Sequence, residues 1–302
     1  MTELRGVLAA VLSSALGGTA VAATRYVIDA TDALTLGAFR FGIGFVLLLA
    51  IARLLPTSTS RWPARGDWPA TLALGLLFFG LFPILFNAAL QYTTAARGAL
   101  ALSTLPLLTM LVGAAVGVEA LDHRKSAGVL LAMAGVALAL LSGLSTAPPR
   151  AWQGDLLMLG AALCMAFYNI GSRSIIRRCG PIPFTLLAMG AGSLGLVVAA
   201  AARGGFVAAL GFGALQWLAV VYLGVFGGAI GFYLWAYALE RTTPTRVAIS
   251  VTVNPVTASL VAAVLLDEAI HWNLVIGLLM VAGGIWLATT LRGRRAAAAG
   301  LV

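Results

Sequence analysis

Long apolar stretches separated by short polar breaks dominate the chain. A helix that crosses a bilayer needs about 20 apolar residues. Ten stretches meet this requirement: 4–24, 33–53, 68–91, 95–117, 125–143, 154–173, 182–202, 212–238, 243–265 and 273–291. Because the backbone in lipid must satisfy its own hydrogen bonds, each stretch predicts an α-helix. We therefore predict an all-α polytopic membrane protein with ten transmembrane helices.

The pattern of these stretches occurs twice. Residues 68–140 align without a gap on residues 217–289, which places Pro106 on Pro255 and Glu119 on Glu268. Internal repeats in an apolar chain are typical of transporters. Each repeat holds five helices, an odd number, so the second must enter the membrane from the opposite side. We predict two inverted repeats, with residues 1–147 forming helices 1–5 and residues 148–302 forming helices 6–10.

Composition and charge support the membrane assignment. Only 10% of the residues are charged, against about 25% in a soluble domain. A net charge of +9 would suggest nucleic-acid binding in a soluble protein. Here, with the N-terminus inside, fourteen of the 19 Lys and Arg residues flank the cytoplasmic helix ends and four flank the opposite ends. This bias predicts that both termini are cytoplasmic. We expect the lipid bilayer as a partner and no nucleic acid.

Two equivalent prolines point to a central cavity. Pro106 and Pro255 lie in the middle of the fourth and ninth stretches. Each removes a backbone hydrogen bond and clashes with the carbonyl four residues earlier, that of Leu102 or Val251. Freed carbonyls at membrane depth are tolerated where they face protein or a wet cavity. Symmetric breaks favour a binding site near the bilayer midplane, whereas a simple packing kink is the alternative.

Polar and aromatic side chains inside the stretches complete the candidate substrate cavity. Polar groups in membrane helices face protein or a cavity rather than lipid. Together with the two prolines, the candidates are Asn87, Ser103, Tyr168, Asn169, Tyr233, Trp235, Thr252 and Asn254. Hydrogen bonding between helices is the alternative role for the asparagines, and an interfacial aromatic belt is the alternative for the aromatic residues of the eighth stretch.

Arg40 is the one basic residue well inside a stretch. A buried arginine needs a carboxylate or several carbonyl groups as partners. The sequence leaves two roles open for it: a structural pairing within the protein, or the binding of a substrate carboxylate.

The sequence lacks the residues that several classes of function require. All ten acidic residues lie at the ends of stretches or between them, which disfavours an antiporter of cationic drugs that uses a buried carboxylate. His123 and His271 lie in short polar segments, and neither an H-E-x-x-H motif nor a phosphate-binding glycine loop occurs. We predict no catalytic residues, no metal site and no cofactor, and therefore a protein that is not an enzyme.

The chain resembles the drug/metabolite transporter superfamily in its ten-helix form with two EamA domains. The resemblance rests on the five-plus-five repeat, the segment from Ala88 to Ala95, and the repeated proline and glutamate positions. The resemblance covers essentially the whole chain and is strongest to bacterial aromatic amino acid and metabolite exporters of the YddG kind. It implies a bacterial inner-membrane protein whose central cavity is lined by helices 1, 3, 4, 6, 8 and 9.

One stretch departs from that pattern. Many members have Trp-Gly before a small polar residue in the first helix, and this chain has Gly17-Gly18-Thr19. The missing aromatic side chain would widen the cavity.

These observations predict an inner-membrane transporter with a small-molecule substrate. We expect it to export amino acids with aromatic or other apolar side chains, and related metabolites, by facilitative alternating access. Export of other small solutes or drugs is the alternative, and a membrane enzyme is a remote one. The sequence leaves open the exact substrate, the direction of transport, proton coupling and the choice between monomer and homodimer.

Overall fold

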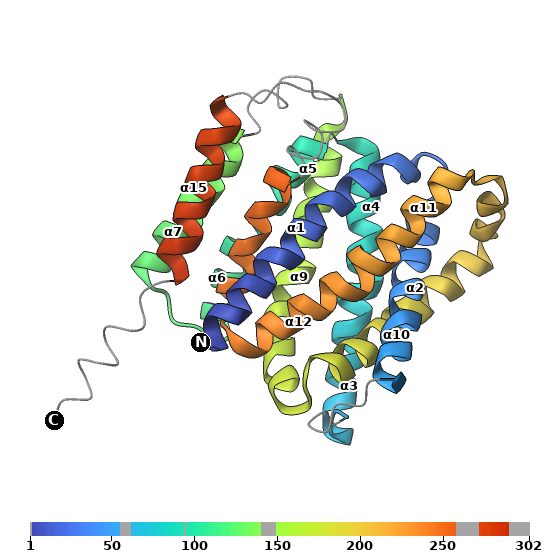
Figure 1. The fold of residues 1–302 in the computed structure, drawn as a ribbon, viewed down its shortest axis with the longest axis horizontal. Helices are drawn as coiled ribbons and strands as arrows, with labels where there is room; N and C mark the ends of the chain where they lie inside the picture. Colours follow the sequence, from blue (N-terminus) through green and yellow to red (C-terminus); the bar gives the residue numbers. More distant parts are fainter. Residues whose placement is uncertain (1, 55–61, 94, 140–148, 258–271, 290–302) are drawn as a thin grey trace.

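A computed structural model describes residues 2–54, 62–93, 95–139, 149–257 and 272–289. Each of the ten predicted stretches contains helix, and within those ranges no strand occurs. The first half holds α1 (Thr2–Ile28), α2 (Ala33–Leu54), α3 (Trp68–Gly75), α4 (Phe82–Tyr92), α5 (Ala95–Leu102), α6 (Leu105–Ala115) and α7 (His123–Ala139). The second half holds α9 (Ala151–Cys179), α10 (Pro181–Ala202), α11 (Ala214–Tyr222), α12 (Gly231–Arg241), α13 (Pro244–Ile249) and α15 (Trp272–Thr289), as Figure 1 shows.

Six described helices are long and apolar enough to cross a membrane: α1, α2, Arg65–Tyr92, α9, α10 and Ala214–Arg241. The fourth span is shorter because it is broken between α5 and α6. The sixth stretch was predicted to end at residue 173, but α9 continues to Cys179. It ends at Gly180, whose φ of 91° lies in the region that favours glycine. The predicted boundary at 147–148, and Glu268 and His271, lie outside the described residues.

The third and eighth spans share an unusual feature. Each passes through a π-helical segment, Leu76–Leu81 (η2) between α3 and α4 and Leu223–Ile230 (η4) between α11 and α12. The two segments occupy equivalent positions in the repeats. Wide turns of this kind are rare and occur frequently at functional sites. The repetition therefore marks these two spans as candidates for lining a site.

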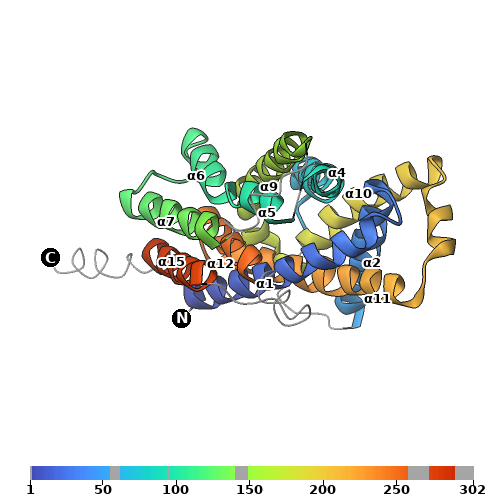
Figure 2. The same cartoon turned by 90° about the horizontal axis from the view of Figure 1, so that it is seen from above.

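Contacts between α7 and α15 reveal how the repeats are related. A Cβ atom on Gly128 would lie 2.7 Å from the carbonyl oxygen of Gly284, and one on Gly135 would lie 2.7 Å from that of Gly277. Because Gly128 and Gly135 are equivalent to Gly277 and Gly284, the same contact occurs twice. The pairing also requires the two helices to run antiparallel, and both views place them side by side (Figures 1 and 2). Equivalent helices that run antiparallel confirm inverted repeats.

Two equivalent arginines, one in each repeat, make the same kind of contact between spans. Arg25 near the end of α1 donates a hydrogen bond to the carbonyl of Leu90 in α4 at 2.8 Å. Its equivalent, Arg173 in α9, donates to the carbonyl of Thr242, just after α12, at 2.9 Å. Figure 2 shows α1, α11 and α12 on one side of the molecule and α4, α6 and α9 on the other. The site described below lies between these two layers.

Aromatic rings from four spans meet in the core. Phe78 stacks on Tyr168 with ring centroids 4.2 Å apart and meets Phe232 edge-on at 5.2 Å. Phe232 in turn lies 5.6 Å from Phe41. Such pairs contribute about 0.5–1.5 kcal/mol each beyond the area they bury. The cluster ties α2, η2, α9 and α12 together, and one of its rings, that of Phe232, also lines the cavity described below.

Asp32 caps α2, and we predict a measurable loss when it is removed. Its carboxylate accepts hydrogen bonds from the N–H groups of Leu34 at 2.9 Å and Thr35 at 3.1 Å. Burial raises the pKa of Asp32, but these bonds and one from the Thr35 hydroxyl outweigh burial and hold the pKa below its ordinary value of 3.8. We expect Asp32→Ala to lower stability by about 1 kcal/mol at neutral pH.

The pH dependence of this loss follows from linkage. The pKa is lower in the folded state, so ionised Asp32 stabilises the protein above its unfolded-state pKa, and the stabilisation disappears as pH falls through the folded-state pKa. In detergent, the unfolding temperature of Asp32→Ala should therefore lie below that of wild type at pH 7. The two unfolding temperatures should converge at pH values below the folded-state pKa of Asp32. A difference that persists unchanged at low pH would contradict this role.

Candidate functional site

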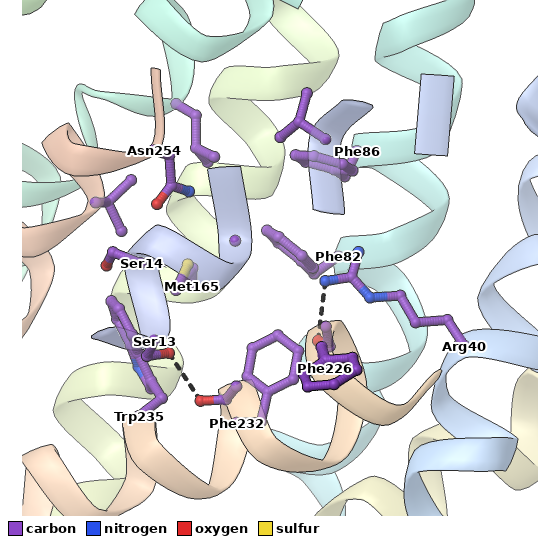
Figure 3. Close-up of a pocket in the computed structure, with 16 residues that line it drawn as sticks. Ser13, Ser14, Arg40, Phe82, Phe86, Met165, Phe226, Phe232, Trp235 and Asn254 are labelled. Atoms are coloured by element: carbon purple, nitrogen blue, oxygen red, sulfur yellow. Dashed lines mark hydrogen bonds between the residues drawn. The ribbon is translucent and has the colours of Figure 1, made fainter. Parts of the chain in front are cut away.

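A cavity lies between the two layers (Figure 3). Its volume is about 60 Å³, enough for a few water molecules and far below the roughly 300 Å³ at which ligand pockets begin. Seven spans contribute its lining residues: Ser13, Ser14, Gly17, Val21, Arg40, Phe82, Phe86, Leu102, Met165, Phe226, Gly227, Gly231, Phe232, Trp235, Val251 and Asn254. A ligand of amino-acid size therefore requires the helices to move apart.

Most of the lining is apolar and aromatic. Phe82 and Phe86 of α4 stack with ring centroids 5.6 Å apart. Phe232 and Trp235 of α12 and Met165 of α9 lie in the same lining (Figure 3). Aromatic side chains offer large contact areas in few orientations. The arrangement suits the apolar part of a small ligand.

Three polar side chains lie on the α1 side of the cavity. The Ser13 hydroxyl donates to the carbonyl of Gly231 at 2.7 Å, and the hydroxyls of Ser14 and Ser250 are 2.8 Å apart. Asn254 is 9% exposed, and its Oδ1 atom has no hydrogen-bond partner among the described residues. A Cβ atom on Gly17 would lie 3.1 Å from Asn254 Nδ2. This side therefore holds one buried acceptor that a ligand could satisfy.

Both proline breaks border the cavity. In the first repeat the chain turns between α5 and α6, where the Thr104 hydroxyl donates to the carbonyl of Ala101 at 2.7 Å. In the second it forms a 3₁₀ turn, Ser250–Thr252 (η5), where the Thr252 hydroxyl donates to the carbonyl of Ile249 at 2.6 Å. Leu102 and Val251, four residues before the prolines, line the cavity. Pro106 and Pro255 themselves are buried and do not line it.

The other sequence candidates divide between the cavity and its surroundings. Trp235 and Asn254 line the cavity. Asn169 lies behind Trp235, since its Oδ1 accepts a hydrogen bond from Trp235 Nε1 at 2.9 Å. Tyr168 is fully buried against Phe78 in the aromatic core. Thus Asn169 can position a lining residue, whereas Tyr168 belongs to the core.

Four candidates lie away from the cavity lining. Asn87 donates to the carbonyl of Ala33 at 3.0 Å and so joins α4 to the start of α2. Ser103 and Thr252 are buried in the two bends. Tyr233 is half-buried and pairs with Tyr237 at 6.1 Å. The structure therefore gives these side chains contacts within or between helices.

The cavity also contains residues that sequence reasoning left out of the candidate set. Ser13 and Ser14 carried no signal beyond being polar in an apolar stretch, and Gly17 had been singled out only as a departure from a family pattern. Arg40 enters from α2, a span that the resemblance did not include among those lining the cavity. Its Nη2 atom donates to the carbonyl of Gly227 at 3.0 Å.

A second, polar pocket of about 290 Å³ lies at the end of the bundle that holds the N-terminus. There buried Glu119 accepts a hydrogen bond from Lys125 at 2.8 Å and another from the backbone N–H of Thr245 at 3.2 Å. Arg246 forms an ion pair with Glu3 of α1. These contacts join four spans at one end of the molecule. In the described parts of the chain, no three His, Cys, Asp or Glu residues are grouped to hold a metal ion.

Comparison with known proteins identifies relatives over the whole chain. The model of the EamA-like transporter family matches residues 4–141 and 152–290. An uncharacterized transporter from Archaeoglobus fulgidus is 23% identical, with 91% of this chain and 95% of the relative covered. A protein from Streptantibioticus cattleyicolor named "Probable terminal-alkyne amino-acid exporter" is 27% identical, with 96% of each chain covered. A solved crystal structure superposes with a TM-score of 0.75 at 25% identity, covering 98% of both chains.

Proposed function

Because the chain belongs to the EamA-like transporter family, we propose that it exports amino acids with aromatic or other apolar side chains, and related metabolites. The observation that carries this proposal is the cavity between the inverted repeats, with phenylalanines along one side and a few polar groups on the other. The name of the relative from Streptantibioticus cattleyicolor adds support, since it specifies an amino-acid exporter.

The mechanism that fits is alternating access across the bacterial inner membrane, with both termini in the cytoplasm. Two features support it. The cavity, at about 60 Å³, is too small for an amino acid, so loading requires an opening motion. The inverted symmetry supplies equivalent helix contacts at both ends, which lets either end open around one fixed site. The arginines and lysines concentrated near one set of helix ends support a cytoplasmic location for that set.

We propose facilitative transport, in which the substrate gradient drives the flux. Among the residues that the structure describes, the lining includes no Asp, Glu or His. A proton-coupled mechanism would need a titratable group reached from the cavity. In the described part of the chain, a cluster of titratable groups lies in the polar pocket around Glu119, at the end of the bundle.

Uptake of radiolabelled phenylalanine and tryptophan into proteoliposomes, with and without a proton gradient, tests the proposal. We expect saturable uptake that the gradient leaves unchanged. Uptake that depends on the proton gradient would support the proposed substrate class but contradict the facilitative mechanism. Folded, inserted protein that moves neither amino acid would contradict the substrate class and favour the alternative of other solutes or drugs, which uptake of labelled choline-like compounds would then test.

A further inference from the structure

Arg40 is a buried cation directed into the cavity from α2. The residue is 8% exposed, and Figure 3 shows the guanidinium beside Phe82 and close to η4. It is the residue through which α2 lines the cavity. An arginine stays protonated in a protein. The cavity therefore carries a permanent positive charge.

This charge has no counter-charge in the described structure. No carboxylate within the described ranges forms an ion pair with Arg40, its Nη2 atom donates to the carbonyl of Gly227, and its Nε atom has no partner. The rings of Phe41 and Phe232 lie 5.3 Å and 5.9 Å from the guanidinium carbon. These rings attract the cation, but they carry no net charge. An intramembrane charge of this kind is costly to bury and is by default a candidate for function.

The surroundings are shaped to admit the guanidinium. Gly227, in the π-helical segment η4, has no side chain where the guanidinium lies, and a Cβ atom there would come within 3.2 Å of Arg40 Nη2. The second repeat offers no equivalent charge, since the residue of α10 that corresponds to Arg40 is the buried Ala188. The repeated architecture alone therefore does not account for Arg40.

We propose that Arg40 binds the carboxylate of the substrate, which makes the site selective for monocarboxylates with an apolar body. A guanidinium can hold a carboxylate through two parallel hydrogen bonds. The apolar body would contact Phe82, Phe86 and Phe232, and an ammonium group, where present, would donate to Asn254 Oδ1. This inference rests on the proposed function and names the group by which the same site recognises its substrate.

Substrate analogues that differ in one group test the inference. In the wild-type protein, 3-phenylpropionate, which keeps the carboxylate, should compete with labelled phenylalanine, whereas phenylethylamine, which lacks it, should not. In Arg40→Met we expect the apparent affinity for phenylalanine to fall at least about tenfold, since a hydrogen-bonded charge pair is lost. The preference for 3-phenylpropionate over phenylethylamine should disappear in the same variant.

Two further variants separate recognition from folding. Arg203→Gln removes an exposed arginine outside the cavity and should leave affinity and preference unchanged. Gly227→Ala keeps the charge but crowds the guanidinium, so it should weaken carboxylate binding even if Arg40→Met does not fold. Thermal unfolding of purified protein with and without 3-phenylpropionate reads binding without transport. If 3-phenylpropionate stabilises wild type but neither Arg40→Met nor Gly227→Ala, the result supports the proposal even if no amino acid is transported.

Two results would overturn it. One is a folded Arg40→Met variant that binds phenylalanine as tightly as wild type and keeps the same preference for the carboxylate. The other is a wild-type protein that 3-phenylpropionate does not stabilise. Failure of amino-acid uptake with carboxylate binding intact would instead contradict the proposed function alone.

Discussion

Tryptophan in place of Gly17 is expected to lower phenylalanine uptake strongly. Gly17 lines the cavity on α1, opposite α4, and a Cβ atom there would already lie 3.1–3.4 Å from the side chain of Asn254. The cavity measures about 60 Å³, so an indole ring would occupy the space that a substrate needs. We expect proteoliposome uptake of phenylalanine to fall at least about tenfold, the loss that 1.4 kcal/mol of binding free energy produces.

A matched control distinguishes a filled cavity from a damaged bundle. A Cβ atom on Gly42 of α2 would meet no described atom within 4 Å beyond its own stretch of helix, and Gly42 lines an apolar groove on the outer surface. Gly42→Trp should therefore insert, fold and transport like wild type. Gly17→Ala should retain most uptake, because Asn254 needs to shift by only a few tenths of an ångström. Normal uptake by a well-folded Gly17→Trp variant would show that substrates pass elsewhere.

Alanine in place of Glu119 is expected to open the end of the bundle that holds the N-terminus. Buried Glu119 accepts hydrogen bonds from Lys125 and from the backbone of Thr245. Removing one partner of a buried pair costs about 3–5 kcal/mol. Because the pair is buried only when this end is closed, the loss destabilises the closed arrangement relative to the open one. A cysteine introduced at Met165, in the cavity lining, should then react with a water-soluble thiol reagent at least about tenfold faster. The native Cys164 and Cys179 are replaced by serine in this background.

Two comparisons sharpen the Glu119 experiment. Glu119→Gln keeps an acceptor oxygen but loses the charge, so its labelling rate should fall between wild type and Glu119→Ala. Asp67→Asn removes an exposed ion pair with Arg178, a type of pair worth about 0–1 kcal/mol, and should leave the rate unchanged. Equal labelling of wild type and Glu119→Ala would mean that other contacts hold this end closed.

Much of the fold was predictable from the sequence. Ten apolar stretches predicted ten helical segments, and the repeat predicted the inverted arrangement that the glycine contacts of α7 and α15 display. The reason is physical: lipid forces apolar backbone into helices, and an odd number of helices per repeat forces inversion. The proline positions also indicated where the fourth and ninth spans break, because proline cannot continue the helical hydrogen-bond pattern.

The lining of the site was less predictable. A helix that is apolar on all sides gives no periodic signal for the face that turns inward. Polarity drew attention to Trp235 and Asn254, which line the cavity, but it could not separate them from Asn87, whose amide joins α4 to α2. Tyr168 looked like a lining residue, and its ring instead stacks in the core. The rotation of each helix about its axis decides whether a side chain faces the cavity or the core. Packing against neighbouring helices fixes that rotation.

The class of protein, its helices and its inverted repeat could be predicted from the amino-acid sequence, because hydropathy and charge act locally along the chain. Which side chains meet across the two layers depends on the packing of the helices. This packing brought Arg40 from α2 beside Gly227 of η4 and Phe232 of α12, residues nearly two hundred positions apart in the chain. Such contacts depend on how helices from opposite repeats cross, and no local pattern in the sequence encodes that crossing.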